Sequence, residues 1–379
     1  MQRLFLLLVI LLAAATPAGA VDHVVFEREG RQMRASGKLL VTAEDGGLLL
    51  LAEDGALWAV EPSELLEHTS DPRPFQPLSA DQLSERLLEE LPDGFQIYTT
   101  VNYVICYNTS RAYAQWCGAL FERLYRAKIN FWSRKGLDAH DPELPLVALV
   151  FGDAASYRSF SEQELGDAVD SIVGYYSLRS NRITMYDLTG VESLRRSGSR
   201  RTTADQINQM LSQPAAAPMV ATIIHEATHQ IAFNCGLQTR YSDVPVWLSE
   251  GLAVYFETPD LQSSNGWRGI GEVNRPRLIT FLRNLPRRPE GSLISLIADD
   301  RRMRDVRTAA DAYAEAWALN YYLIRHQPDK FVAYLEMLSE KPRLVWDDPA
   351  TRLAEFRRFF GEDLAALDAD FVRQMQRVR

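Results

Sequence analysis

One pentapeptide constrains this chain more than any other feature: His225-Glu226-Ala227-Thr228-His229. It lies in an apolar stretch that Pro218 opens and Gly236 closes, and these residue types are typical of a helix start and a helix end. Histidines four positions apart on a helix lie on the same face, where both imidazoles can reach a single Zn²⁺. Glu226 can accept a proton from a water beside that metal. We therefore predict a site for one zinc ion, with His225 and His229 as ligands and Glu226 as general base.

A catalytic zinc site needs a third protein ligand and an open fourth position. Glu250 lies in a second apolar stretch, which Ser242 or Asp243 can cap and Pro245 can begin as a helix. A carboxylate in such a stretch needs a partner, because burying an unpaired charge is costly, and a metal would be that partner. We expect Glu250 to be the third ligand; the alternatives are a surface position for Glu250 and Cys235 as the ligand in its place.

The first twenty residues have the pattern of a secretory signal peptide. Arg3 precedes the apolar run Leu4–Ala15, and small residues lead to a cleavage point after Ala20. A retained N-terminal anchor is the alternative, although the run is short for a bilayer span. No later segment of the sequence is long and apolar enough to cross a membrane. We expect an exported protein, periplasmic or extracellular, with no membrane span after cleavage.

The charge balance argues against nucleic acid as a partner. The chain has 41 Lys and Arg against 50 Asp and Glu, a formal net charge of −9, which repels phosphates overall. A local exception, expected to be a solvated loop, is formed by Arg195, Arg196, Arg200 and Arg201. The expected partner is a peptide or cell-envelope substrate, and the sequence leaves the oligomeric state open.

Export would permit a disulfide. Cys106 lies in an expected strand and Cys117 in the helix after it. A bridge between them and two free thiols are both compatible with the sequence, which does not show the distance between the Cβ atoms. Cys235 would remain as a small buried side chain at a helix end.

Four parts are expected along the chain: a signal peptide (1–20), a small β-hairpin module (21–70), a linker (71–78) and one large domain (79–379). In the module, Ala-Glu-Asp-Gly occurs twice, at Ala43 and Ala52, and Asp-Gly between apolar runs is a hairpin signal. The linker is indicated by three prolines between Asp71 and Pro77.

The large domain is expected to be α+β, with an α/β half to about residue 217 and a helical half from 218 to 379. Apolar periodicity and turn residues predict strands at 96–107, 144–151, 172–177 and 182–186. Loops are expected over 188–218. Helices are expected at 110–128, 157–164, 275–285, 308–326, 328–339 and from 353 to the C-terminus.

The two motifs together resemble the gluzincin zinc metallopeptidases. His225-Glu226-x-x-His229 followed by Trp247-Leu248-Ser249-Glu250-Gly251 carries this resemblance. The chain is still more similar to an uncharacterised bacterial domain family of the peptidase-MA-like type. The likeness runs from about Tyr98 to the C-terminus, with Val173–Tyr176 and Tyr313–Leu319 as further landmarks. It implies a zincin-like fold, in which a mixed sheet, the HExxH helix and a helical half enclose a cleft.

The resemblance also implies roles for other residues. In gluzincins the strand upstream of the zinc helix pairs with extended substrate, and Val173, Gly174 and Tyr175 occupy that place here. In the aminopeptidase branch a tyrosine opening a later helix donates a hydrogen bond to the oxyanion, and Tyr313 has the matching position. The alternatives are a packing role for Tyr313, or Tyr321, Tyr322 or His326 in its place.

The chain departs from the gluzincin pattern in two respects. Thermolysin-like enzymes have an acid one turn after the third ligand, but here that position is Val254 and the next acid is Glu257. The group that orients a zinc histidine must then come from elsewhere. No residues for holding a substrate N-terminus are evident, so exopeptidase activity is unsupported.

The expected function is zinc-dependent hydrolysis of peptide or cell-envelope amide bonds. A zinc-stabilised binding or structural protein of the cell envelope, without turnover, is the alternative. The second alternative is a structural module without metal, in which the spacing of the two histidines is a coincidence.

Overall fold

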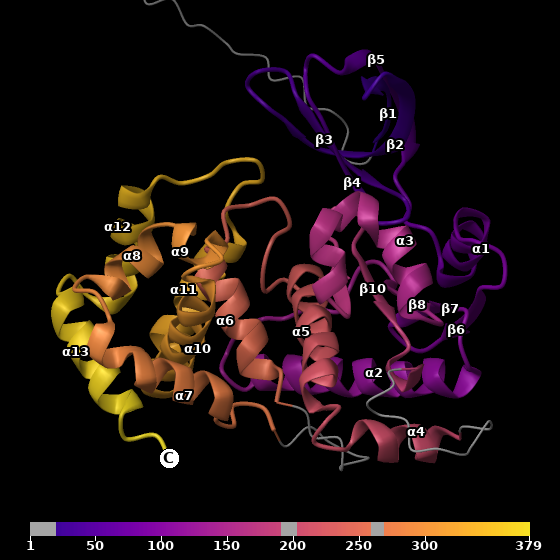
Figure 1. The fold of residues 1–379 in the computed structure, drawn as a ribbon. Coiled ribbons are helices and arrows are strands. Elements are labelled where there is room, and N and C mark those ends of the chain that lie inside the picture. The colour runs from indigo at the N-terminus through magenta and orange to yellow at the C-terminus, as the bar shows by residue number, and fades with distance from the viewer. Residues whose placement is uncertain (1–19, 191–202, 259–268) are drawn as a thin grey trace, which may run out of the picture. The chain divides into compact units, whose positions relative to one another are not determined.

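A computed structural model of the chain describes residues 20–190, 203–258 and 269–379 (Figure 1). The chain forms two compact units, Met1–Pro77 and Leu78–Arg379. The expected signal peptide lies outside the described residues except for Ala20, and the arginine cluster at 195–201 lies outside them as well. Within the described part, no helix combines the length and apolar character that a membrane span requires.

The first unit is a five-stranded antiparallel sheet with the strand order β4-β3-β2-β1-β5. Its core includes Val24, Phe26 and Leu50. Residues 71–74, which we expected in the linker, belong instead to the edge strand β5, where proline is tolerated because one side of an edge strand makes no ladder bonds. The strands are β1 (Ala20–Arg28), β2 (Arg31–Thr42), β3 (Leu48–Ala52), β4 (Leu57–Val60) and β5 (Leu65–Pro74).

The second unit contains a mixed five-stranded sheet with the order β6-β7-β8-β10-β9. The central pairs β7–β8 and β8–β10 are parallel, and the outer pairs are antiparallel. The single strand expected at 96–107 is two strands, because the chain turns between Thr100 and Tyr103 and pairs Ile97 with Cys106. The strands are β6 (Gln96–Thr99), β7 (Tyr103–Tyr107), β8 (Leu146–Phe151), β9 (Gly174–Tyr176) and β10 (Arg182–Tyr186).

Helices cover both faces of this sheet. On one face, α2 (Arg111–Ser133), α4 (Ala204–Leu211) and α5 (Ala217–Asn234) share an apolar core with the sheet. On the other face lie α1 (Ala80–Glu90) and α3 (Ala154–Leu165). Loops had been expected where α4 lies, but Thr203 and Gln206 form a capping box that begins this short helix. Two short 3₁₀ segments, η1 (Gly166–Ser171) and η2 (Leu188–Gly190), lie in the connections.

The three cysteines are free and buried. Successive side chains of a strand point to opposite faces. On β7, Ile105 and Tyr107 face α2, whereas Cys106 packs in the core beneath α1 and α3. Cys117, on α2, lies in the core on the opposite face of the sheet. The Cys106–Cys117 bridge that the sequence left open is therefore not formed.

The remainder of the second unit is helical. In this half α10 packs against α6 and α7, and Trp247 and Trp317 are fully buried in the shared core. The last expected helix is two helices, since Gly361 (φ +107°) interrupts it. The helices are α6 (Val246–Phe256), α7 (Arg275–Asn284), α8 (Ser292–Ala298), α9 (Arg301–Arg304), α10 (Ala309–His326), α11 (Pro328–Ser339), α12 (Pro349–Phe360), α13 (Leu364–Met375) and the 3₁₀ turn η4 (Leu285–Arg287).

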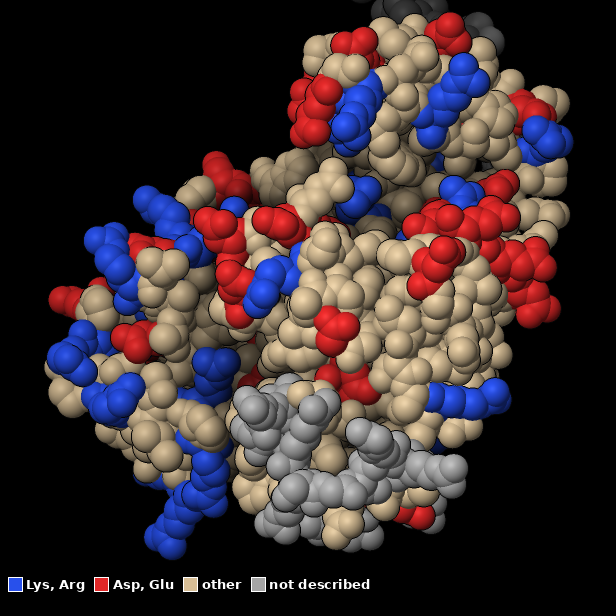
Figure 2. Space-filling view, turned by 45° about the vertical axis from the view of Figure 1, so that its right-hand side comes forward, with Lys and Arg blue, Asp and Glu red and all other residues tan. Residues whose placement is uncertain are grey.

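The described residues thus form 13 α-helices and two five-stranded sheets, which confirms the α+β class. The surface of the helical half carries ion pairs between residues two positions apart, Arg301–Asp299 and Arg307–Asp305, and the largely buried Arg288 pairs with the distant Asp368. Figure 2 shows the two signs of charge interspersed over this half.

Candidate metal centre

The helix α5 holds the HExxH residues firmly against the sheet. Pro218 lies in its first turn and Gly236, with φ +81°, follows its last cap residue, as predicted. Gln230 is fully buried and donates hydrogen bonds to the carbonyls of Val147 (3.0 Å) and Asn181 (2.9 Å). These bonds fix the rotation of α5, so that the neighbouring histidines face α6.

The helix α6 carries Glu250 and begins one residue after Pro245. Its first N–H, that of Val246, is satisfied by Asp300 Oδ1 (3.1 Å) rather than by Ser242 or Asp243. Asp243 instead forms a buried ion pair with Arg352 (2.5 Å). The cap predicted from the local sequence was therefore wrong, because a distant acid replaces it.

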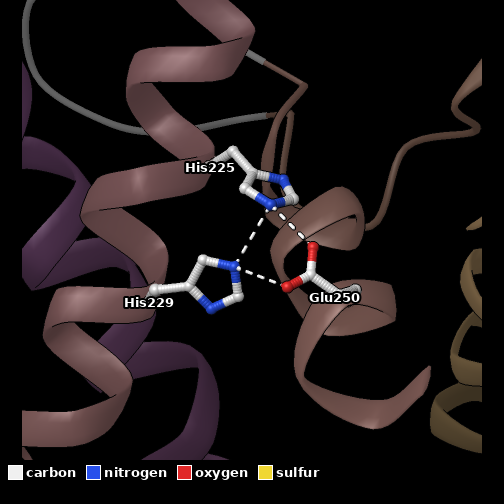
Figure 3. Close-up of side chains that lie close together, drawn as sticks. All are labelled: His225, His229 and Glu250. Carbon is white, nitrogen blue, oxygen red and sulfur yellow. Dashed lines mark hydrogen bonds and ion pairs between the residues drawn. The ribbon is translucent and has the colours of Figure 1, made fainter. Parts of the chain in front are cut away.

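The structure brings His225, His229 and Glu250 together (Figure 3). Their side chains are 11–20% exposed. His225 Nε2 lies 3.1 Å from Glu250 Oε2 and 3.1 Å from His229 Nε2, which lies 3.4 Å from Glu250 Oε1. A tetrahedral zinc ion with bonds of about 2.0–2.1 Å needs donor atoms about 3.3 Å apart. The three donors therefore suit zinc in both chemistry and spacing.

The outer nitrogens of both imidazoles have hydrogen-bond partners. His229 Nδ1 lies 3.3 Å from Ser249 Oγ, which itself donates to Gln238 Oε1 (3.1 Å) and so can accept the imidazole proton. His225 Nδ1 lies 3.2 Å from Glu257 Oε2. Protons on the two Nδ1 atoms leave both Nε2 lone pairs directed at the centre, which is the tautomer that a metal requires.

Glu257 is the orienting acid that the sequence analysis did not assign. It lies seven residues after Glu250, as the C-cap residue of α6, and a spacing of two helical turns brings both acids towards one face of the helix. Asn274 Nδ2 donates to Glu257 Oε1 (2.9 Å) and holds the carboxylate in place. The i, i+7 spacing was a signal in the sequence, although the end of α6 could not be fixed to one residue.

The protein chain distributes charge unequally among these acids. Burial acts to raise the pKa of Glu250, but His229 and His225 outweigh it and hold that pKa well below its usual range. Burial acts to lower the pKa of His225, and hydrogen bonds to Glu250 and Glu257 raise it well above its ordinary value. For Glu226 burial outweighs the two histidines, so its pKa is raised. Glu226 is therefore the acid of the group best suited to hold a proton.

A cleft of about 880 Å³ opens beside the three donors. Glu226 lies in its wall, where Oε2 accepts a hydrogen bond from the backbone N–H of Tyr176 on β9 (2.8 Å). Tyr313, on α10, also lines the cleft, as do Glu250 and Glu226. Burial raises the pKa of Tyr313 well above the usual value for tyrosine.

Only some residues of the expected substrate strand lie in the wall of the cleft. Val173 and Tyr176 line the cleft, whereas Gly174 and Tyr175 are not among the described lining residues. The Tyr175 side chain points to the other face of the sheet, where its hydroxyl donates to Glu164 Oε2 (3.2 Å). Strand β9 lies at the edge of the sheet.

The alternative residues lie elsewhere in the fold. Tyr322 donates to Asp370 Oδ2 (2.6 Å) and stacks on His326, and Tyr321 packs against Arg325. None of the three alternatives to Tyr313 is among the described residues that line the cleft. Cys235 is buried in the core between α2 and the sheet, away from the group of donors.

Residues 219–345 match a family described as a protein of unknown function, DUF1570. The matched segment contains all three donor residues together with Glu226 and Tyr313. Comparison of the chain with curated proteins gives no match.

Proposed function

We propose that the chain is an exported zinc-dependent hydrolase of the gluzincin type that cleaves peptide or cell-envelope amide bonds. One observation carries the proposal: His225, His229 and Glu250 converge at the spacing of a tetrahedral zinc site, beside Glu226, in the wall of a cleft of about 880 Å³. The order of elements also supports a gluzincin, since the edge strand β9 precedes the HExxH helix α5, with β10 and α4 between them, and α6 with the third donor follows. The N-terminal sequence supports export.

A zinc ion held by these donors would supply Lewis acidity, polarising a scissile carbonyl and lowering the pKa of an attacking water. Glu226 would accept the proton of that water and pass it to the leaving amine. The Tyr176 N–H fixes Glu226 through Oε2, and Oε1 has no hydrogen-bond partner among the described residues. A raised pKa suits a carboxylate that takes up and then releases a proton.

Two further groups are placed to handle a substrate. Tyr313 lines the cleft, where its hydroxyl can donate to the carbonyl oxygen as negative charge develops on it, and a raised pKa keeps that hydroxyl protonated. On β9, the N–H of Ser177 bonds to Arg182 in the sheet, whereas that of Tyr176 points out to Glu226. The outer edge of β9 therefore faces the cleft, where an extended peptide can add as a further strand.

Zinc content tests the metal site. Elemental analysis of the purified protein is expected to give about one zinc per chain, lost or weakened in His229→Ala and in Glu250→Ala. Exposed Glu362, changed to Ala, serves as the control that keeps its metal. Absence of zinc from the wild type would refute the proposal and favour the module without metal.

Turnover tests the hydrolase. Wild type and Glu226→Gln are compared on a library of internally quenched peptides. Glu226→Gln should keep its zinc and lose about 10²–10⁴-fold in kcat, the usual contribution of a general base. If Glu226→Gln retains every measurable function of a zinc-loaded wild type, the alternative stands and the chain is a zinc-stabilised binding protein.

A further inference from the structure

Among the described residues that line the cleft, one cation has no acidic partner. Of the described lining residues, three are arginines. Arg352 pairs with Asp243 (2.5 Å) and with Asp300 (2.9 Å), and Arg304 lies 3.5 Å from Asp300. Arg277 makes no ion pair with any residue in the described part of the chain. A half-buried guanidinium without an acid is a group that a ligand can still bind.

Arg277 is held beside the metal centre by a short series of contacts. Its backbone N–H donates to Asn274 Oδ1 (3.2 Å), and the Asn274 amide donates to Glu257, the partner of His225. Its guanidinium lies over the ring of Tyr313, with Cζ 5.7 Å from the ring centre. Because Tyr313 and Glu250 line the same cleft, the cation over the Tyr313 ring lies on the side of the cleft that holds the donors.

Helix stability does not explain an arginine at this position. Arg277 lies in the first turn of α7, where the helix dipole disfavours a positive charge. The backbone N–H that would attract an anion there is already bonded to Asn274, so the side chain is the group left for recognition. The acids in the cleft wall explain what Arg277 can do. Glu226 and Glu257 would repel an acidic substrate unless a cation offset their charge.

We propose that Arg277 is a specificity-determining residue that binds a carboxylate of the substrate close to the scissile bond. The inference rests on the proposed hydrolase and narrows its substrates to acidic peptides or amides. The carboxylate has two chemical sources, a Glu or Asp side chain and a free C-terminus. Both would form a bidentate pair with the guanidinium.

Binding of zinc-chelating probes tests this without requiring turnover. The first probe is the hydroxamate Ac-Ala-X-NHOH, in which X is Glu or Gln. The second probe is hydroxamoylacetyl-X-Ala, in which X is again Glu or Gln and the C-terminus is either free or amidated. Dissociation constants are measured by calorimetry for the zinc-loaded wild type, for Arg277→Gln and for the control Arg304→Gln, an exposed arginine of the same cleft. Zinc content and melting temperature verify that each variant is folded.

The wild type is expected to bind at least one carboxylate probe about tenfold more tightly than its neutral counterpart, as a charge-assisted hydrogen bond provides. Arg277→Gln should abolish that ratio with unchanged binding of the neutral probe, and Arg304→Gln should keep it. Comparison of the Glu probe with the Gln probe tests a side-chain carboxylate, and comparison of the free with the amidated C-terminus tests a C-terminal carboxylate. Three results overturn the inference about Arg277 and leave the metal site standing. They are equal affinities of the wild type for carboxylate and neutral probes, an affinity ratio retained in Arg277→Gln, and an equal loss of the ratio in Arg304→Gln. Failure of the wild type to bind any probe overturns the metal site, and the inference with it.

Discussion

Among single residues, Glu257 has the clearest testable role at the metal centre. Glu257→Gln removes the charge that holds the His225 imidazole in the tautomer suited to zinc, while Asn274 can still bond to the new amide. Loss of such an outer partner typically weakens metal binding about 10–100-fold. Competition with a chromophoric chelator measures the zinc dissociation constant. Glu272→Gln, an exposed residue nearby, is the matched control; equal affinities of the two variants would show that Glu257 does not orient His225.

Lys128 gives a prediction that depends on pH. Its ammonium is almost fully buried, donates to the Thr228 carbonyl of α5 (2.5 Å), and lies 5.4 Å from the centre of the Phe256 ring. Burial lowers the pKa of Lys128 to about 7 from 10.5. Between these two pH values the unfolded chain binds more protons than the folded chain, so the lysine destabilises fully below pH 7 and progressively less as the pH rises towards 10.5.

Lys128→Met should therefore unfold at higher urea concentration than wild type at pH 7. The difference in unfolding free energy should shrink by up to about 1.4 kcal/mol per pH unit between pH 7 and 10. Urea titrations at four pH values measure it, with Lys330→Met, at an exposed lysine, as control. A difference that stays constant with pH would mean that folded Lys128 keeps its ordinary pKa.

Single residues also show which parts of the candidate site could be predicted from the sequence. That His225, His229 and Glu250 lie together could be predicted, because residues four positions apart share a helix face and because an acid in an apolar stretch needs a partner. The bond from the Tyr176 N–H to Glu226 could not, since it joins residues 50 positions apart and depends on where β9 meets α5. That Arg277 has no acid partner among the described residues likewise becomes visible only when the elements around the cleft are assembled.

At the scale of helices, the site depends on how closely α6 approaches α10. A Cβ atom on Gly251 would lie 2.1 Å from Asn320 Nδ2 and 2.6 Å from the Ala316 carbonyl oxygen. Gly251→Ala must therefore push α6 outward and move Glu250 relative to the histidines. We expect a loss of about 1–3 kcal/mol in unfolding free energy together with weaker zinc binding. Urea unfolding and zinc titration measure the two effects.

Gly190→Ala is the control for this substitution, because a Cβ atom there meets no atom of the described residues within 4 Å. If Gly251→Ala lost stability but kept the zinc affinity of the wild type, the contact between α6 and α10 would support the fold without positioning Glu250. A loss of both is the result that links the packing of these helices to the metal centre.

Helices and strands were predictable where the local sequence pattern is regular. They were less predictable where the pairing of strands determines the boundaries. The helix α5 follows from its proline, its glycine and its apolar period. The division of residues 96–107 into β6 and β7 was missed, because both halves contain residues that favour strands and only the short turn between Thr100 and Tyr103 separates them. The opposite placement of Cys106 and Cys117 follows from strand alternation once β7 is defined, since alternate residues of β7 face different helices.

For the whole molecule, the division into two units separates the proposed chemistry from the N-terminal sheet. The first unit has a core of its own, including Phe26 and Leu48, and the described cleft residues all belong to the second unit. The second unit also contains three apolar cores that pack its sheet and its helices. Folding and metal binding should therefore not require the first unit.

A chain of residues 78–379 is accordingly expected to fold cooperatively and to bind zinc with the affinity of the chain that contains both units. The three donors, Glu257 and the Gln230 bonds that fix α5 are all retained in it. Circular dichroism during thermal unfolding and the chelator titration give the comparison, with Glu250→Ala in the shortened chain as the control that loses zinc. If the shortened chain folds but binds zinc more weakly, the first unit contributes to the centre, and the assignment of all proposed chemistry to residues 78–379 is wrong.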